Sequence, residues 1–320
     1  MGATLYIDHR AVQIRRDRSA LELRLPDRPP RRIPLRGLDR VVVHGSAEID
    51  AAALNLMWET GVAFLCLTGR TGTAGARFHG AAHKDAGLRL AQYALWHDAE
   101  TRLAWARDLF RFRLRVLRKT ARSIAARRRG GRQALAPAIE AIRRAEASIV
   151  SVPDLNALRG VEGAVAAAWF SVLAGLFPPS LGFSTRQRRP PPDPVNAALS
   201  LGYTIATAEA SRAAVRVGFD PAIGLSHGLA HGRESLALDL VEPARPLVDG
   251  FVHDLFHRRA LEARSFTADG KGGVLLGKAG RRVFYEAWEI EAAPRIRTVI
   301  QLASREGIRR LRSRKATGCE

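Results

Sequence analysis

Apolar and polar residues alternate along the first 80 residues in the way that is typical of β-strands. The run from Leu21 to Leu25 alternates leucine with charged residues, which predicts a half-buried strand. Proline, glycine and aspartate separate the other apolar runs and indicate turns between them. Further strands are expected at 5–7, 32–35, 40–45 and 62–67, with a helix over 50–60 that begins at Asp50 and ends at Gly61.

The pattern changes near residue 86, where apolar residues begin to recur at the spacing of α-helices. A long amphipathic helix is predicted to start near Leu88 and to continue through Val116. Further helices are expected after the capping residues Asp154 and Asp193, and across 235–246 with a kink or restart at Pro243. The predicted fold is therefore α+β, with a small N-terminal mainly-β domain (1–82) and a larger mainly-α-helical domain (83–320).

Composition excludes several classes of protein. Hydrophobic residues make up 47% of the chain and charged residues 26%, as in globular proteins. We expect no membrane association, since no apolar run approaches the roughly 20 residues that span a bilayer, and the N-terminus lacks the pattern of a signal peptide. Cys66 and Cys319 are too far apart in sequence to suggest a disulfide framework or a zinc-ligand pair. A reducing prokaryotic cytoplasm is the expected compartment.

The chain is strongly basic. It holds 51 Lys and Arg against 31 Asp and Glu, a formal net charge of +20, which favours a polyanionic partner and nucleic acid first. A GC-rich coding bias is the alternative explanation. The stretch 101–132 contains twelve Lys or Arg and one acid, Asp108. This stretch is either a solvated basic helix face or a surface that follows DNA phosphates.

Glu162 lies in the middle of an apolar helical stripe. Burying an unpaired carboxylate is costly, so this side chain must be protonated, paired or bound to a cation. An ion pair with Arg159 is the alternative to a functional role. Gly160 and Gly163 weaken the helix around Glu162 by roughly 1 kcal/mol each, which indicates that something approaches the backbone closely there. The stripe consists of Leu155, Leu158, Val165 and Trp169.

A histidine and two further acids are the other candidates for chemistry. His227 follows the helix end expected at Gly218, on an irregular segment where a side chain can be aimed at a site. Asp239 and Glu242 share one helix face, and like charges there repel unless a cation is near. A salt bridge from Glu242 to Arg245 is the structural alternative. Weaker candidates of the same kind as His227 are His231 and His253.

Carboxylates with one imidazole form a ligand set that suits Mg²⁺ or Mn²⁺ better than a closed zinc site. In a cationic chain that binds polyanions, such an ion points to phosphodiester chemistry. The residues alone therefore indicate a metal-dependent enzyme that acts on nucleic acid.

At these motifs the sequence resembles the CRISPR-associated adaptation integrases, the endonuclease-like proteins that insert new spacers into CRISPR arrays. The resemblance runs nearly the whole length, with the motifs in the family's order. The matching segments are 5–7, 33–35, 41–45, 158–163, 190–203, His227, 239–246 and 274–276.

The resemblance implies roles for particular residues. It implies that Glu162, His227 and Glu242 bind the metal, Mg²⁺ or Mn²⁺, and that Asp239 assists beside it as a fourth catalytic residue. Supporting positions around the site, and arginines that would hold the DNA backbone, complete the implied set. The supporting positions are Asn196 and Tyr203, and the DNA-binding arginines are Arg111, Arg115, Arg118 and Arg245.

The resemblance also implies partners and a reaction. An N-terminal β-domain would form a homodimer, and a small ferredoxin-like companion dimer would bridge two such dimers into a heterohexamer. The substrates would be double-stranded DNA, both the spacer precursor and the leader–repeat junction, joined by transesterification. Two alternatives stay open: a metal-dependent nuclease or resolvase acting on branched DNA, and a non-catalytic basic DNA-binding subunit.

Overall fold

The chain forms two compact units, Met1–Lys84 and Asp85–Glu320. The structure, a computed structural model, describes residues 2–9, 11–26, 28–68, 73–80, 85–188, 190–270 and 272–317, with side chains up to residue 312. The expected domain boundary after residue 82 and Cys319 lie outside the described residues.

The N-terminal unit contains two four-stranded sheets and one helix. In the first sheet two parallel pairings, β1 with β5 and β5 with β7, are followed by an antiparallel strand. In the second, β2 pairs with β3 antiparallel and with β6 parallel. The first sheet has the order β1 (Ala3–Ile7), β5 (Leu38–His44), β7 (Ala63–Thr68), β8 (Thr73–Phe78), and the second β4 (Arg28–Pro34), β3 (Ala20–Leu25), β2 (Val12–Asp17), β6 (Ala47–Ile49).

Local sequence signals explain most of these elements. Helix α1 (Ala51–Glu59) begins where the Asp50 carboxylate accepts a hydrogen bond from the backbone N of Ala53 at 2.6 Å. It ends before Gly61, whose φ of +72° favours glycine. The buried leucines of β3 pack with Ile14 and Val41 in the core of the unit. Strands β2, β6 and β8 were not predicted from the sequence, because each is short or poor in apolar residues.

The second unit is mainly helical, so the predicted α+β class with a strand-rich N-terminal part is confirmed. A short hairpin of β9 (Phe266–Ala268) and β10 (Val274–Leu276) and a π-helix over Trp288–Ala292 interrupt its helices. Short 3₁₀ turns cover Pro179–Leu181, Glu242–Ala244 and Ala263–Ser265. The helices are α2 (Ala86–Trp96), α3 (Ala99–Ala126), α4 (Gly131–Ser148), α5 (Leu155–Ala174), α6 (Pro194–Val217), α7 (Ser235–Val241), α8 (Arg245–His257), α9 (Lys278–Ala287) and α10 (Ala293–Thr317).

The long helix expected from Leu88 through Val116 is two helices. The carboxylate of Asp98 accepts from the backbone N of Thr101 at 2.9 Å and caps α3, so the chain turns between Trp96 and Ala99. The prediction of one continuous helix was wrong because the apolar spacing is kept across the break.

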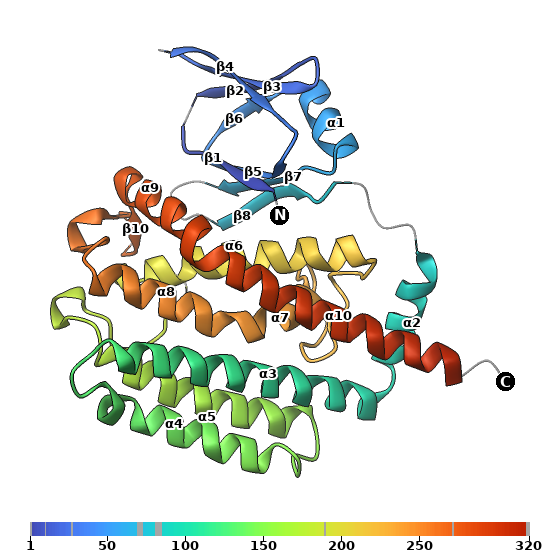
Figure 1. Cartoon of the computed structure of the whole chain (residues 1–320), viewed down its shortest axis with the longest axis vertical. Helices are drawn as coiled ribbons and strands as arrows, with labels where there is room; N and C mark the ends of the chain where they lie inside the picture. The colour runs from blue at the N-terminus through green and yellow to red at the C-terminus, as the bar shows by residue number, and fades with distance from the viewer. Residues whose placement is uncertain are drawn as a thin grey trace. The chain divides into compact units, whose positions relative to one another are not determined.

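Helix α5 is long and apolar enough, by length and composition alone, to cross a membrane. The expectation that the chain holds no apolar run of that length was therefore wrong. Arg159 and Glu162 interrupt the apolar sequence, but the helix continues through them and the rest of it is apolar. The core helix of a globular protein has the same composition, and α5 packs against α3 and α4 (Figure 1).

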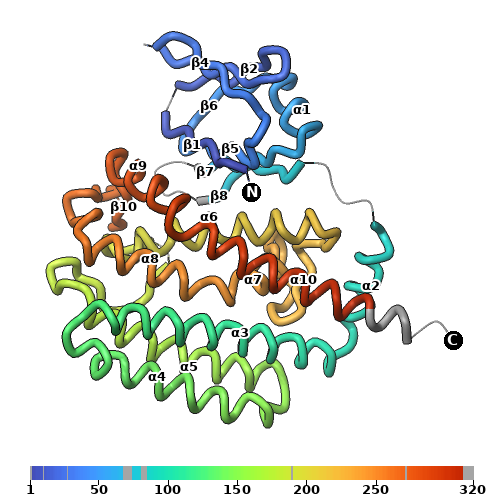
Figure 2. The backbone as a smooth tube through the Cα atoms, viewed as in Figure 1, coloured from blue at the N-terminus to red at the C-terminus, as the bar shows by residue number. Residues whose placement is uncertain are grey.

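Helices of the second unit surround its polar centre. Helix α6 packs against α7 and α8, and α3 packs against α8 and the 3₁₀ turn at Glu242. Helix α10 packs against α6 and crosses it at an angle, as the trace in Figure 2 shows. Large buried side chains fill the spaces between these helices, among them Trp169, Trp288, Phe110 and Phe284. The packing therefore brings segments that are more than 100 residues apart in sequence to one centre.

Candidate active site

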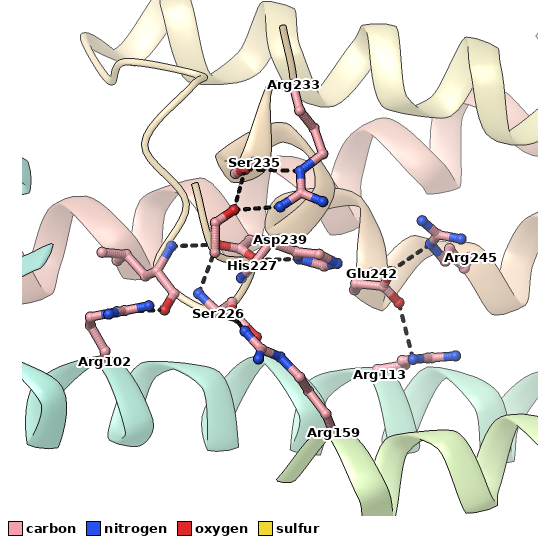
Figure 3. Close-up of polar contacts among 12 residues, drawn as sticks. Arg102, Arg113, Arg159, Ser226, His227, Arg233, Ser235, Asp239, Glu242 and Arg245 are labelled. Carbon is pink, nitrogen blue, oxygen red and sulfur yellow. Dashed lines mark hydrogen bonds and ion pairs between the residues drawn. The ribbon is translucent and has the colours of Figure 1, made fainter. Parts of the chain in front are cut away.

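Asp239 fixes the orientation of His227. Its carboxylate, 1% exposed on α7, accepts hydrogen bonds from the backbone N of Leu225, Ser226 and His227 at 2.6, 3.0 and 2.9 Å. The same carboxylate lies 2.6 Å from Nδ1 of the His227 ring (Figure 3). With the Nδ1 proton held there, a neutral imidazole presents the lone pair of Nε2 to another partner.

Glu242 lies between two arginines. Its Oε2 is 3.0 Å from Nη1 of Arg113 on α3, and its Oε1 is 2.8 Å from Nε of Arg245 (Figure 3). Burial alone would raise the pKa of Glu242, but attraction to Arg245, Arg113 and His227 outweighs burial and lowers it. The salt bridge to Arg245, the structural alternative, is therefore present together with a second ion pair.

Glu162 does not pair with Arg159. The Arg159 guanidinium donates instead to Oδ1 of Asn156 at 3.0 Å and to the carbonyl of Ser226 at 2.8 Å. Burial raises the pKa of Glu162, and the negative charge of Glu242 raises it further, whereas Arg113 lowers it. Glu162 thus lies within electrostatic reach of the other predicted ligands, with Arg113 as its main positive neighbour.

Arg113 and Asp249 belong to the site but were not predicted from the sequence. Arg113 is 15% exposed and faces inward, but in the sequence it is one of twelve cations in a single run. Asp249 on α8 is 3% exposed and accepts hydrogen bonds from the Tyr203 hydroxyl and from Nε1 of Trp169, the latter at 2.8 Å. Burial raises the pKa of Asp249 to about 6, although both hydrogen bonds oppose that rise.

The two supporting positions have different surroundings. The ring of Tyr203 lies between the guanidiniums of Arg186 and Arg245, whose carbons are 5.3 and 5.1 Å from its centroid. Asn196 is fully buried and organises the loop before α6: its Oδ1 accepts from Arg186 Nη1 and the backbone N of Gln187, and its Nδ2 donates to the carbonyl of Thr185. Tyr203 therefore borders the site, whereas Asn196 shapes the approach to it.

The arginines predicted to bind DNA do not all lie together. Arg245 is inside the site, 16% exposed, against Glu242 and Tyr203. Arg111 pairs with Asp108 at 2.8 Å, Arg118 pairs with Glu146, and Arg115 lies over the ring of Phe112. Arg111 and Arg115 line a cavity of about 690 Å³ between α3 and α10. They are two residues from Arg113, about 200° around the helix, and so face away from Glu242.

The weaker histidine candidates lie elsewhere. His231 is exposed in the loop before α7, and His253 is buried within α8, where its ring stacks on that of His257 at 5.6 Å.

The chemistry of the predicted ligand set fits a hard divalent ion, but the side chains do not form a closed cage. Two carboxylates and an imidazole with Nε2 available are suitable donors. As they are placed, no three His, Cys, Asp or Glu side chains of the described ranges stand close enough together to hold an ion. In this structure the positive charge beside Glu162 and Glu242 is the guanidinium of Arg113.

Comparisons with known proteins agree with the resemblance seen in the sequence. The profile of the family described as CRISPR associated protein Cas1 matches residues 5–290. A protein of Thermodesulfovibrio yellowstonii named CRISPR-associated endonuclease Cas1 1 is 36% identical over 289 residues, which are 90% of each chain.

Two solved structures show a similar fold. A casposase bound to its integration product has a TM-score of 0.81 and 21% identity, covering 98% of this chain and 91% of that one. The structure titled Cas6-RT-Cas1–Cas2 complex has a TM-score of 0.80 and 20% identity, covering 98% of this chain and 35% of that one. The profile match and the identity to the curated relative together show that the chain belongs to the family of the CRISPR-associated endonuclease Cas1.

Proposed function

We propose that the chain inserts short DNA spacers into a CRISPR array by metal-dependent transesterification. The observation that carries the proposal is the electrostatic coupling of Glu162 and Glu242 to each other and to His227, with the His227 ring oriented by Asp239. Two half-buried carboxylates that repel each other cost stability, and a bound cation would remove that cost.

In this proposal Glu162, Glu242 and Nε2 of His227 would hold Mg²⁺ or Mn²⁺. When bound, the ion would supply Lewis-acid activation of the target phosphodiester and stabilise charge on its oxygens. Asp239 keeps the Nδ1 proton of His227 in place so that Nε2 points to the site. Arg245 and Tyr203 border the site and would hold the DNA close to it.

The reaction balances without a further reagent. The 3′-hydroxyl oxygen of the spacer forms a bond to phosphorus and loses its proton. The bond from phosphorus to the leaving 3′-oxygen of the array breaks, and that oxygen takes up a proton. The number of phosphodiester bonds is unchanged.

The proposed partners are DNA, a second copy of the chain and a companion protein, of which the structural relatives suggest the DNA and the companion. One structural relative is bound to an integration product and another is part of a complex with Cas2. We propose that this chain acts on double-stranded DNA as a homodimer, within a heterohexamer bridged by a small ferredoxin-like companion, in the cytoplasm.

A second candidate function is a non-catalytic DNA-binding subunit. The two ion pairs of Glu242 with Arg113 and Arg245 favour it, because a purely structural role would leave the carboxylate in this state.

Strand transfer of a short 3′-hydroxyl duplex into a supercoiled plasmid carrying an array separates these possibilities. With Mn²⁺ or Mg²⁺ the wild type should give joined product, and Glu162→Gln should lose at least about a hundredfold of the rate while still binding DNA. DNA binding by the wild type without any joined or cleaved product would leave the binding subunit, and equal activity in Glu162→Gln would overturn the assignment of Glu162 to the catalytic site. Hydrolysis without joined product would favour a nuclease or resolvase.

A further inference from the structure

Arg113 has an unusual position for a structural ion pair. It reaches from α3 into the site, and its Nη1 is 3.0 Å from Oε2 of Glu242. Its Nε is buried and has no hydrogen-bond partner among the described residues. The guanidinium is therefore held by charge, with part of its hydrogen-bonding capacity unused.

The charge of Arg113 serves more than one carboxylate. Arg245 already neutralises Glu242 from the other side, at 2.8 Å. Glu162 lacks its nearest candidate partner, because the guanidinium of Arg159 is bound to Asn156 and Ser226. Burial alone would lower the pKa of Arg113, but attraction to Glu242 and Glu162 outweighs burial and raises it. Arg113 thus supplies positive charge to both carboxylates that the proposed function assigns to the metal.

We propose that Arg113 substitutes for the divalent cation in the ion-free chain, and that cation binding displaces its guanidinium from Glu242. This inference rests on the proposed function, because it takes Glu162 and Glu242 as ligands. A divalent ion held by these two carboxylates would lie close to the guanidinium. Like charges at such separations repel strongly where water is scarce. Arg113 therefore stabilises the empty site and weakens binding of the cation.

The test is titration with Mn²⁺ alone, without DNA, on the full chain, with free Mn²⁺ counted by electron paramagnetic resonance. Arg113→Gln removes the charge and should bind Mn²⁺ about tenfold more tightly than the wild type, whereas Arg113→Lys keeps the charge and should stay within about threefold. Arg118→Gln is the matched control, since it removes an arginine of the same helix that pairs with Glu146 instead. Its Mn²⁺ affinity should equal that of the wild type.

A second readout is thermal unfolding with and without Mn²⁺. The ion-free Arg113→Gln variant should melt lower than the wild type, and saturating Mn²⁺ should raise its melting temperature by more than it raises that of the wild type. If the variant does not fold without the ion, Mn²⁺ should restore folding. Failure to restore it would overturn the inference.

The possible failures are distinguishable. Unchanged or weaker Mn²⁺ binding in Arg113→Gln would mean that Arg113 organises the ligands, and would overturn this inference alone. A wild type that binds no Mn²⁺ would overturn the metal centre of the proposed function, and this inference with it.

Discussion

Asp249 is a buried acid whose ionisation works against the fold. Because burial raises its pKa from 3.8 to about 6, the folded chain holds this proton more tightly than the unfolded chain does. The protonated Asp249 side chain therefore contributes its full stabilisation below about pH 4, and this stabilisation is lost as the pH rises through about 6. The free energy of unfolding falls by up to about 3 kcal/mol over that interval.

Replacing Asp249 by asparagine should remove this dependence, because an amide does not titrate. The free energy of unfolding of the wild type should fall relative to Asp249→Asn between about pH 4 and 6.5. Urea unfolding of both proteins at a series of pH values measures the difference. Parallel curves across that interval would contradict the prediction.

The site residues that could be predicted from the sequence were those with an unusual local pattern around them. Glu162 was identified by its place in an apolar stripe, and Glu242 by its spacing from Asp239 and by the proline that follows it. Arg113 and Asp249 carry no such signal, since a cation in a basic helix and an acid in an amphipathic helix usually face water. Only the packing of α3 and α8 against the site turns these two side chains inward.

Three of the glycines that lie inside helices, where glycine is unfavourable, differ in their surroundings, and packing explains only one of these three. A Cβ built on Gly160 or Gly163 of α5 meets nothing within 4 Å, whereas one on Gly307 of α10 would lie 2.2 Å from the ring of Trp105. Packing within the chain thus accounts for Gly307 but does not account for the two glycines that flank Glu162.

Alanine substitutions should therefore have opposite effects. Gly160→Ala and Gly163→Ala should each raise the free energy of unfolding by about 0.5–1 kcal/mol, because alanine favours the helix and the space is open. Gly307→Ala should lower it by about 1–3 kcal/mol through overpacking. Chemical denaturation of the three variants tests this, and destabilisation by either α5 substitution would show that the helix needs those glycines for itself.

Element boundaries were predictable where a cap marked them. Asp50, Asp154 and Asp193 each cap the helix that was expected after them. The break at Asp98 was missed although Asp98 caps in the same way, because the apolar spacing continues across it. The three-residue strand β6 depends on parallel pairing with β2, which local sequence does not reveal.

For the whole molecule, the excess of positive charge is only partly used inside the fold. Arg111 and Arg118 are neutralised by Asp108 and Glu146, but Arg115 has a ring rather than an acid as its described partner. With a net charge of +20, many other cations are also left for a polyanion. DNA binding should therefore release counterions and weaken steeply with salt.

Binding of duplex DNA measured by fluorescence anisotropy at several salt concentrations tests this. Between about 50 and 200 mM salt the affinity should fall at least about a hundredfold. Glu162→Gln should keep the same slope, because phosphate contacts and metal chemistry use different residues. Arg115→Gln should reduce the slope of log affinity against log salt by about one, the loss of one phosphate contact. An affinity that stays level over this range would mean that the positive charge of the chain does not hold the DNA, whatever the site does to it.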